Sequence, residues 1–218
     1  MNFGAIYGFL HKLNLTSVSE FQAYLQLGFE HITDPNGYDH VLFVVSLCAI
    51  YSLQQWQSVL ILVTAFTIGH SATLALSTLR IINFRSDVVE LLIPVTIIIT
   101  CFLNFRNPLS APSAPGGRLR YGLALAFGLI HGLGFSNYLR SLLGQEVGIF
   151  TPLLAFNLGL EAGQLLIVAL ALATAALFVN VLGVRRDKLC WILSGIVAGM
   201  ATSLVLANEF FRSFTSSH

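Results

Sequence analysis

Long apolar stretches alternate with short polar breaks along most of the chain. A helix needs about 20 apolar residues to cross a hydrocarbon core about 30 Å thick. Six stretches are of about this length, and they predict an all-α membrane protein with six transmembrane helices. The predicted spans are residues 39–55, 57–79, 87–105, 119–143, 150–181 and 189–210.

The N-terminal part follows a different pattern. Ser17 and Glu20 have the spacing of a capping box, and apolar residues then recur along one stripe. This pattern predicts a short amphipathic helix lying at the membrane interface and ended by the turn sequence DPNG, residues 34–37. We therefore expect an N-terminal interfacial helix and turn over residues 1–37 and a six-helix transmembrane domain over residues 38–218.

Composition supports a multi-pass protein embedded in a lipid bilayer. The 218 residues are 56% hydrophobic and only 10% charged, against roughly 25% charged in soluble domains. The net charge is +1, and no Lys/Arg cluster indicates a nucleic-acid partner. The three cysteines form no CxxC pair and are expected to be small buried hydrophobic residues.

Basic residues suggest an orientation. With six spans, the first, third and fifth loops carry six Lys or Arg residues close to helix ends, and the side with both termini carries five. Because the positive-inside bias acts in short loops, we expect both termini outside. Residues 1–15 have no signal-peptide or transit-like pattern, so the expected location is a bacterial inner membrane.

Ionisable residues inside the predicted spans are costly, by at least about 2.5 kcal/mol each on insertion scales. Counted along the helices, those not at the inner edge fall in the outer half of the membrane. Three histidines and two carboxylates can then converge in one outward-facing cavity, and such a mixed set suits Zn, Ni, Co or Fe. The candidate metal ligands are Asp39, His40, His70, His131 and Glu161, followed by His31 and Glu90.

Neutral polar residues can support these ligands. Asn157, Glu161 and Gln164 have i, i+4, i+7 spacing and share one helix face. Ser71 follows His70 directly. We therefore expect Ser71, Asn157 and Gln164 to form hydrogen bonds around the site.

Each candidate also has a simpler interpretation. A single intramembrane histidine can be a hydrogen-bonded packing residue, and Asp39 can cap the first span. Glu90 can complement a helix dipole or pair with Arg85 or Arg80, and His31 can be a solvated interfacial residue.

Four segments over residues 31–165 resemble the HupE/UreJ family of small membrane proteins. They are HITDPNGYDHVLFVVSL, FTIGHSATLAL, FGLIHGLGF and FNLGLEAGQL. The resemblance implies six to eight spans, nickel or cobalt permease activity linked to hydrogenase and urease maturation, and metal-handling positions at Asp39, His40, His70, His131 and Glu161.

Two positions depart from the pattern of the transporter-like members. Seven residues separate His31 from Asp39, where those members usually have five. Phe127 stands where they carry a histidine four residues before His131. His31 is therefore set apart from the main predicted ligands.

Three functions follow from these observations. The first is a permease for a divalent metal ion, nickel or cobalt. The second is an intramembrane zinc hydrolase with Asp39 and Glu161 as candidate catalytic residues, of which one is the general base. The third is a structural or assembly subunit whose polar network fixes helix packing. Self-association and association with other membrane proteins both stay open.

Overall fold

A computed structural model describes residues 17–107, 115–143 and 148–215, and every regular element in these ranges is helical. Residues 108–114, which fall in the loop between the predicted spans 87–105 and 119–143, and the residues before 17 lie outside the described ranges. The side chain of the predicted cap Ser17 also lies outside them. The elements are α2 (Ser17–Thr33), α3 (Asp39–Cys48), the 3-10 helix η1 (Leu53–Gln55), α4 (Trp56–Thr78), α5 (Ser86–Arg106), α6 (Pro115–Leu143), α7 (Phe150–Asn180), α8 (Arg186–Ala207) and α9 (Glu209–Thr215).

Five of the described helices are long and apolar enough to cross a membrane, namely α4 with η1, α5, α6, α7 and α8. The span expected over residues 39–55 is instead the ten-residue helix α3, which is only about 15 Å long. A local cap explains the break after α3, because the backbone N–H and the hydroxyl of Ser52 both donate to the side chain of Gln55, at 3.0 and 3.2 Å. This arrangement starts η1 and α4 and ends the preceding helical run.

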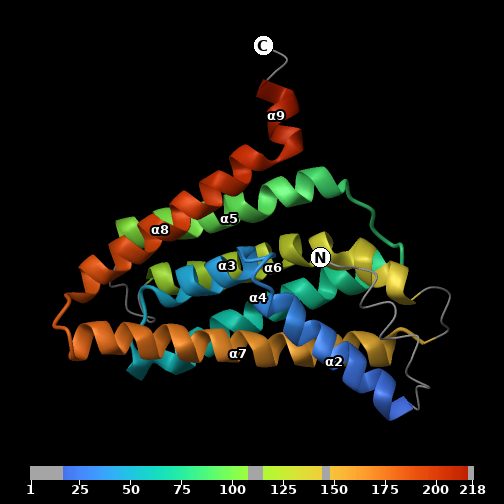
Figure 1. Cartoon of the computed structure of the whole chain (residues 1–218), viewed down its shortest axis with the longest axis horizontal. Coiled ribbons are helices and arrows are strands. Elements are labelled where there is room, and N and C mark those ends of the chain that lie inside the picture. Colours follow the sequence, from blue (N-terminus) through green and yellow to red (C-terminus); the bar gives the residue numbers. More distant parts are fainter. Residues whose placement is uncertain (1–16, 108–114, 144–147, 216–218) are drawn as a thin grey trace.

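The predicted N-terminal helix is present as α2, but it packs along α7 rather than lying apart on the bundle surface. α2 faces the first part of α7, where Gly163 meets Ile32. α3 follows after the turn and lines a groove with later α7 residues, Ile167 and Leu170. α2 and α3 therefore run in succession beside α7, with a break at residues 34–38 (Figure 1).

Glycines set two close helix crossings. A Cβ at Gly28 of α2 would overlap the carbonyl oxygen of Phe156 in α7, and a Cβ at Gly159 of α7 would overlap that of Leu25. Backbones can approach this closely only because glycine has no side chain.

The second crossing repeats the first, between α4 and α6. A Cβ at Gly69 would overlap the carbonyl oxygen of Leu125, and a Cβ at Gly128 would overlap that of Phe66. In both pairs the helices are parallel: Gly159 meets Leu25 and Gly163 meets Ile32, while Gly128 meets Phe66 and Gly132 meets Thr73. The two pairs run in opposite directions to each other (Figure 1).

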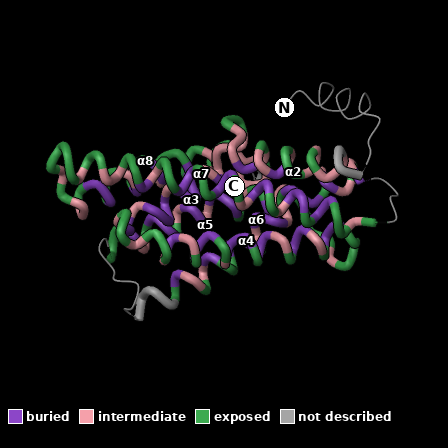
Figure 2. The backbone as a smooth tube through the Cα atoms, turned by 90° about the horizontal axis from the view of Figure 1, so that it is seen from below, coloured by how far each residue is buried: buried purple, intermediate pink, exposed green. Residues whose placement is uncertain are grey.

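The outer faces of the bundle suit a lipid environment. Figure 2 shows buried residues toward the inside of the bundle and exposed residues along its outer helices. The exposed positions include large apolar side chains such as Leu170, Ile192 and Ile196, which are 60%, 56% and 56% exposed. So much apolar surface is unfavourable in water and normal against acyl chains.

Candidate metal centre

Four histidines from four helices meet near the break between α2 and α3. His31 lies in the last turn of α2 and His40 in the first turn of α3, while His70 and His131 lie within α4 and α6. The ring centroid of His40 is 4.7 Å from that of His31, 5.1 Å from that of His131 and 6.2 Å from that of His70. Potential ligand atoms of His31, His40 and His70 all lie within 4.8 Å of one another. We call the four residues the histidine cluster.

The cluster holds buried nitrogen atoms with no hydrogen-bond partner in the described part of the chain. They are His31 Nε2, His40 Nε2, both ring nitrogens of His70 and His131 Nδ1. An unpaired buried polar atom costs about 1–3 kcal/mol. Five such atoms in one place therefore indicate a site that binds something, and imidazole nitrogens are ligands for divalent transition metals.

Asp39 orients the ring of His40. Its Oδ1 atom lies 3.1 Å from His40 Nδ1 and accepts the backbone N–H of His40 at 2.9 Å. A carboxylate at Nδ1 holds the proton there and directs the lone pair of Nε2 away from Asp39. Asp39 thus acts on the cluster through His40.

Thr96 of α5 orients His131 in the same way. Its hydroxyl donates to the carbonyl of Ile93 at 2.7 Å and lies 3.1 Å from His131 Nε2. Since the hydroxyl proton is used by Ile93, His131 Nε2 must carry a proton and donate it to Thr96. The lone pair of His131 then lies on Nδ1, one of the unpartnered atoms.

His31 lies in α2, which is not one of the five candidate spans. Burial lowers the pKa of its imidazole well below the ordinary value, and His40 lowers it further. A neutral imidazole keeps a lone pair for a metal.

The predicted supporting residues connect α4 to α7 beside the cluster. The Ser71 hydroxyl donates to Asn157 Oδ1 at 2.6 Å, and the Thr67 hydroxyl donates to Gln164 Oε1 at 2.7 Å. These bonds hold α4, and with it His70, against α7.

Two of the predicted carboxylate ligands, Glu161 and Glu90, lie away from the histidine cluster. Glu161 is half-buried and makes no hydrogen bond or ion pair within the described ranges, and it is not among the grouped ligand atoms. Glu90 is exposed. His31, which its spacing had set apart, lies in the cluster because the turn after α2 brings it back toward His40.

Sequence reasoning missed Thr96, which no motif contains. A threonine two residues after Pro94, inside an apolar helix, is the signal that could have found it.

Two cavities, which we call the vestibules, flank the turn at residues 34–38. One, of about 300 Å³, is lined by Glu30, His31 and Asp34. The other, of about 290 Å³, is lined by Asn36, Asp39 and Glu90. Both lie toward the end of the bundle where α6 and α8 end, since Tyr138 and Ala207 also line them. We call this the vestibule end.

Between the histidine cluster and the end of the bundle opposite the vestibules, the interior is filled first by apolar and then by polar side chains. Phe43 and Phe66 are buried, and their rings lie 5.2 and 5.1 Å from His131. Beyond them, Asn104 donates to the Ser46 carbonyl at 2.8 Å and accepts from Arg120 at 2.8 Å.

Arg120, near the start of α6, is only 7% exposed. We call Ser46, Asn104 and Arg120 the polar lock. It joins α3, α5 and α6 at the opposite end.

Comparison with known proteins gives a family for the chain. The family model described as HupE / UreJ protein matches residues 7–208. No match is found among curated proteins or among solved structures.

Proposed function

Because the chain belongs to the HupE/UreJ family, which is associated with nickel and cobalt transport, we propose that it is a permease for a divalent nickel or cobalt ion. The observation that carries the proposal is the set of buried, unpartnered imidazole nitrogens from four helices. The fold is consistent with transport, because the bundle that holds this polar centre contains five helices long and apolar enough to cross a membrane.

In this proposal His31, His40 and His70 are the metal ligands, and His131 is a fourth through Nδ1. Nitrogen donors suit Ni²⁺, Co²⁺ and Zn²⁺ better than Mg²⁺ or Ca²⁺. Asp39 keeps His40 in the correct tautomer. Glu161 stays a candidate ligand for a second conformation, because it lies on the α7 face that also carries Asn157 and Gln164.

The vestibules supply the access route. Glu30 and Asp34 lie beside His31, and Glu90 lies on the same cavity as Asp39. Carboxylates at the mouth of a low-dielectric site raise the local concentration of cations. With both termini outside, as the basic residues predict, the vestibule end is the side from which the ion enters.

The interruption between α2 and α3, which run in succession beside α7, gives further support for transport. Transporters often bind their ions where discontinuous helices end near the membrane midplane, between repeats of inverted direction. The parallel pairs α2/α7 and α4/α6 run in opposite directions and share the same glycine register. Movement of one pair against the other would open the polar lock and close the vestibules.

The geometry favours transport over the two alternatives. A zinc hydrolase needs a free base next to the metal, but Asp39 is held by His40 and Glu161 lies outside the cluster. A purely structural network would pair its buried nitrogens with each other, whereas five of them have no partner among the described residues.

Two measurements test the proposal. Equilibrium dialysis of the purified protein with Ni²⁺ or Co²⁺ should show bound metal that His131→Ala weakens. The wild-type protein in liposomes should take up the same ion, and His131→Ala should not. Bound metal without uptake would overturn the permease function while keeping the site, and absence of binding would overturn both.

A further inference from the structure

A polar pocket at the opposite end of the bundle adjoins an apolar groove that runs along α3. The groove has a volume of about 570 Å³ and is lined by α3, α7 and α8. The polar pocket is smaller, about 70 Å³. Ala49, Ala175 and Leu189 line both, so the pocket continues the groove.

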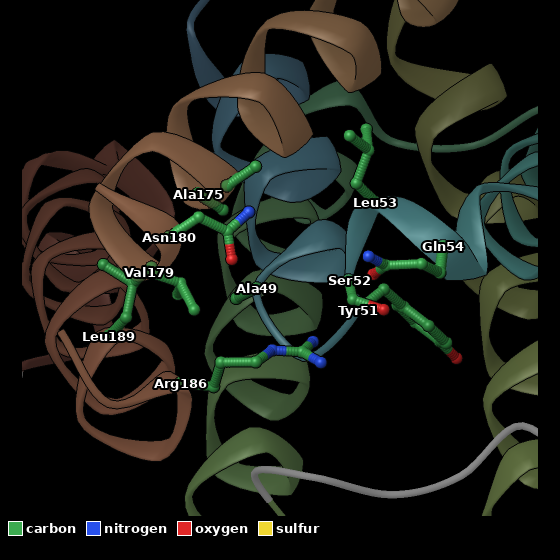
Figure 3. Close-up of a pocket in the computed structure, with 11 residues that line it drawn as sticks. Ala49, Tyr51, Ser52, Leu53, Gln54, Ala175, Val179, Asn180, Arg186 and Leu189 are labelled. Carbon is green, nitrogen blue, oxygen red and sulfur yellow. The ribbon is translucent and has the colours of Figure 1, made fainter. Parts of the chain in front are cut away.

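The polar pocket presents a cation that no carboxylate neutralises. Figure 3 shows the Arg186 side chain reaching across the pocket toward Tyr51 and Ser52, with the Asn180 amide on another side. Arg186 donates one hydrogen bond, to the carbonyl of Ile50 at 3.2 Å. No acidic residue of the described chain pairs with it.

The neighbouring arginine differs in this respect. Arg185 forms two hydrogen bonds with Asp187, at 3.1 and 2.6 Å. Arg185 is therefore an exposed ion pair beside the pocket, and Arg186 retains guanidinium donors for an anion. A planar guanidinium matches the geometry of a phosphate group.

The groove is suited to a hydrocarbon chain. α7 and α8 are joined by the turn at residues 181–185 and diverge from it (Figure 1), and α3 lines the groove together with them. Val41 and Val45 of α3 line the groove, and the exposed side chains of Leu170 and Ile196 form part of its rim. Its volume falls within the about 300–1,000 Å³ of sites that hold small molecules.

We propose that these two cavities together bind one anionic phospholipid, with its phosphate at Arg186 and one acyl chain in the groove. Charge complementarity selects this occupant, since the pocket offers an unpaired cation directly beside apolar surface. The basic end of a membrane protein faces the leaflet that carries anionic lipids. The bound lipid fills the groove that α3, α7 and α8 line.

The test titrates phosphatidylglycerol and phosphatidylcholine into the full chain in detergent, with bound lipid counted by native mass spectrometry. Wild-type protein should retain phosphatidylglycerol preferentially. Arg186→Gln should weaken that binding by about tenfold or more, as expected for a lost charge-assisted contact. Arg185→Gln removes the same charge and should bind like wild type, and Arg186→Lys should bind with intermediate affinity.

A second pair of variants tests the groove. Ala175→Phe fills the junction of the two cavities and should reduce binding of both lipids, while Ala173→Phe, at an exposed position of α7 that does not line either cavity, should not. Thermal unfolding of each variant without lipid shows whether it is folded.

Two results would overturn the proposal. Equal losses for Arg186→Gln and Arg185→Gln would indicate unspecific attraction to positive charge. Competition by inorganic phosphate as strong as that by the lipid would show an anion site that does not use the groove.

Discussion

The two ends of the bundle carry opposite chemistry. At the vestibule end, Glu30, Asp34 and Glu90 lie around cavities that lead to unpartnered imidazoles. At the opposite end, Arg120 is buried and donates to the Asn104 amide oxygen and to the Leu103 carbonyl. The first region has unpartnered ligand atoms beside cavities, whereas the interior of the second is filled by the hydrogen-bonded side chains of the polar lock. In the proposed permease, the first region would be the binding site and the second the closed side of the transport path.

The largest effect should come from removing a central ligand. His70→Ala should weaken binding of Ni²⁺ or Co²⁺ by more than about 100-fold, because loss of a ligand costs more than loss of a supporting contact. Isothermal titration measures the affinity. Ser203→Ala, at an exposed position of α8 far along the chain from the cluster, is the control and should bind like wild type. Unchanged affinity of His70→Ala would remove His70 from the ligand set.

Gly128→Ala should break the crossing that positions the cluster. Its Cβ would overlap the carbonyl oxygen of Phe66, and overpacking of this kind costs about 1–3 kcal/mol. Gly122→Ala in the same helix meets nothing within 4 Å and is the matched control. Thermal unfolding should show a lowered Tm only for Gly128→Ala, and equal Tm values for both variants would contradict the close crossing.

Asn104→Ala should affect the opposite end alone. It removes the amide between the Ser46 carbonyl and Arg120, and each buried group left unpaired costs about 1–3 kcal/mol. We expect a lower Tm and an unchanged metal affinity. A loss of metal affinity as large as that of His70→Ala would show that the two ends are not separate.

A smaller effect is expected for Asp39→Asn. The amide oxygen can still accept from His40, but the charge that holds the proton on Nδ1 is lost, so metal affinity should fall by about 10- to 100-fold. The Tm should change little. An affinity loss beyond that of His70→Ala would mean that Asp39 binds the metal directly.

The smallest effect should come from the vestibules. Glu90→Gln should slow ion capture a few-fold at low salt and have no effect at high salt, because screening shortens the reach of an exposed charge to about 8–10 Å near physiological ionic strength. Stopped-flow binding at two salt concentrations measures this. A salt-independent loss would identify Glu90 as a ligand.

Much of the fold was predictable because the membrane makes apolar length informative. The ranges 57–79, 87–105 and 150–181 agree with α4, α5 and α7 to within a few residues. The prediction of one span over residues 39–55 was wrong because a capping interaction at Ser52 breaks the helix. Hydropathy does not register such local hydrogen bonds.

The candidate site was only partly predictable, for a geometric reason. His40, His70 and His131 were identified because polar residues are costly inside spans. Whether two side chains far apart in sequence meet depends on the rotation of each helix about its axis. That rotation brings Thr96 onto His131 and leaves Glu161 outside the cluster.

The sequence by itself determined that this is a helical membrane protein of the HupE/UreJ family with histidines at the start of and inside apolar segments, because length, hydropathy and motif are properties of the chain alone. The tertiary structure decided the rest. The turn after α2 returns His31 to His40, the glycine crossings set the depth of His70 and His131, and packing buries Arg120 against Asn104. These arrangements depend on contacts between helices, which no single stretch of sequence contains.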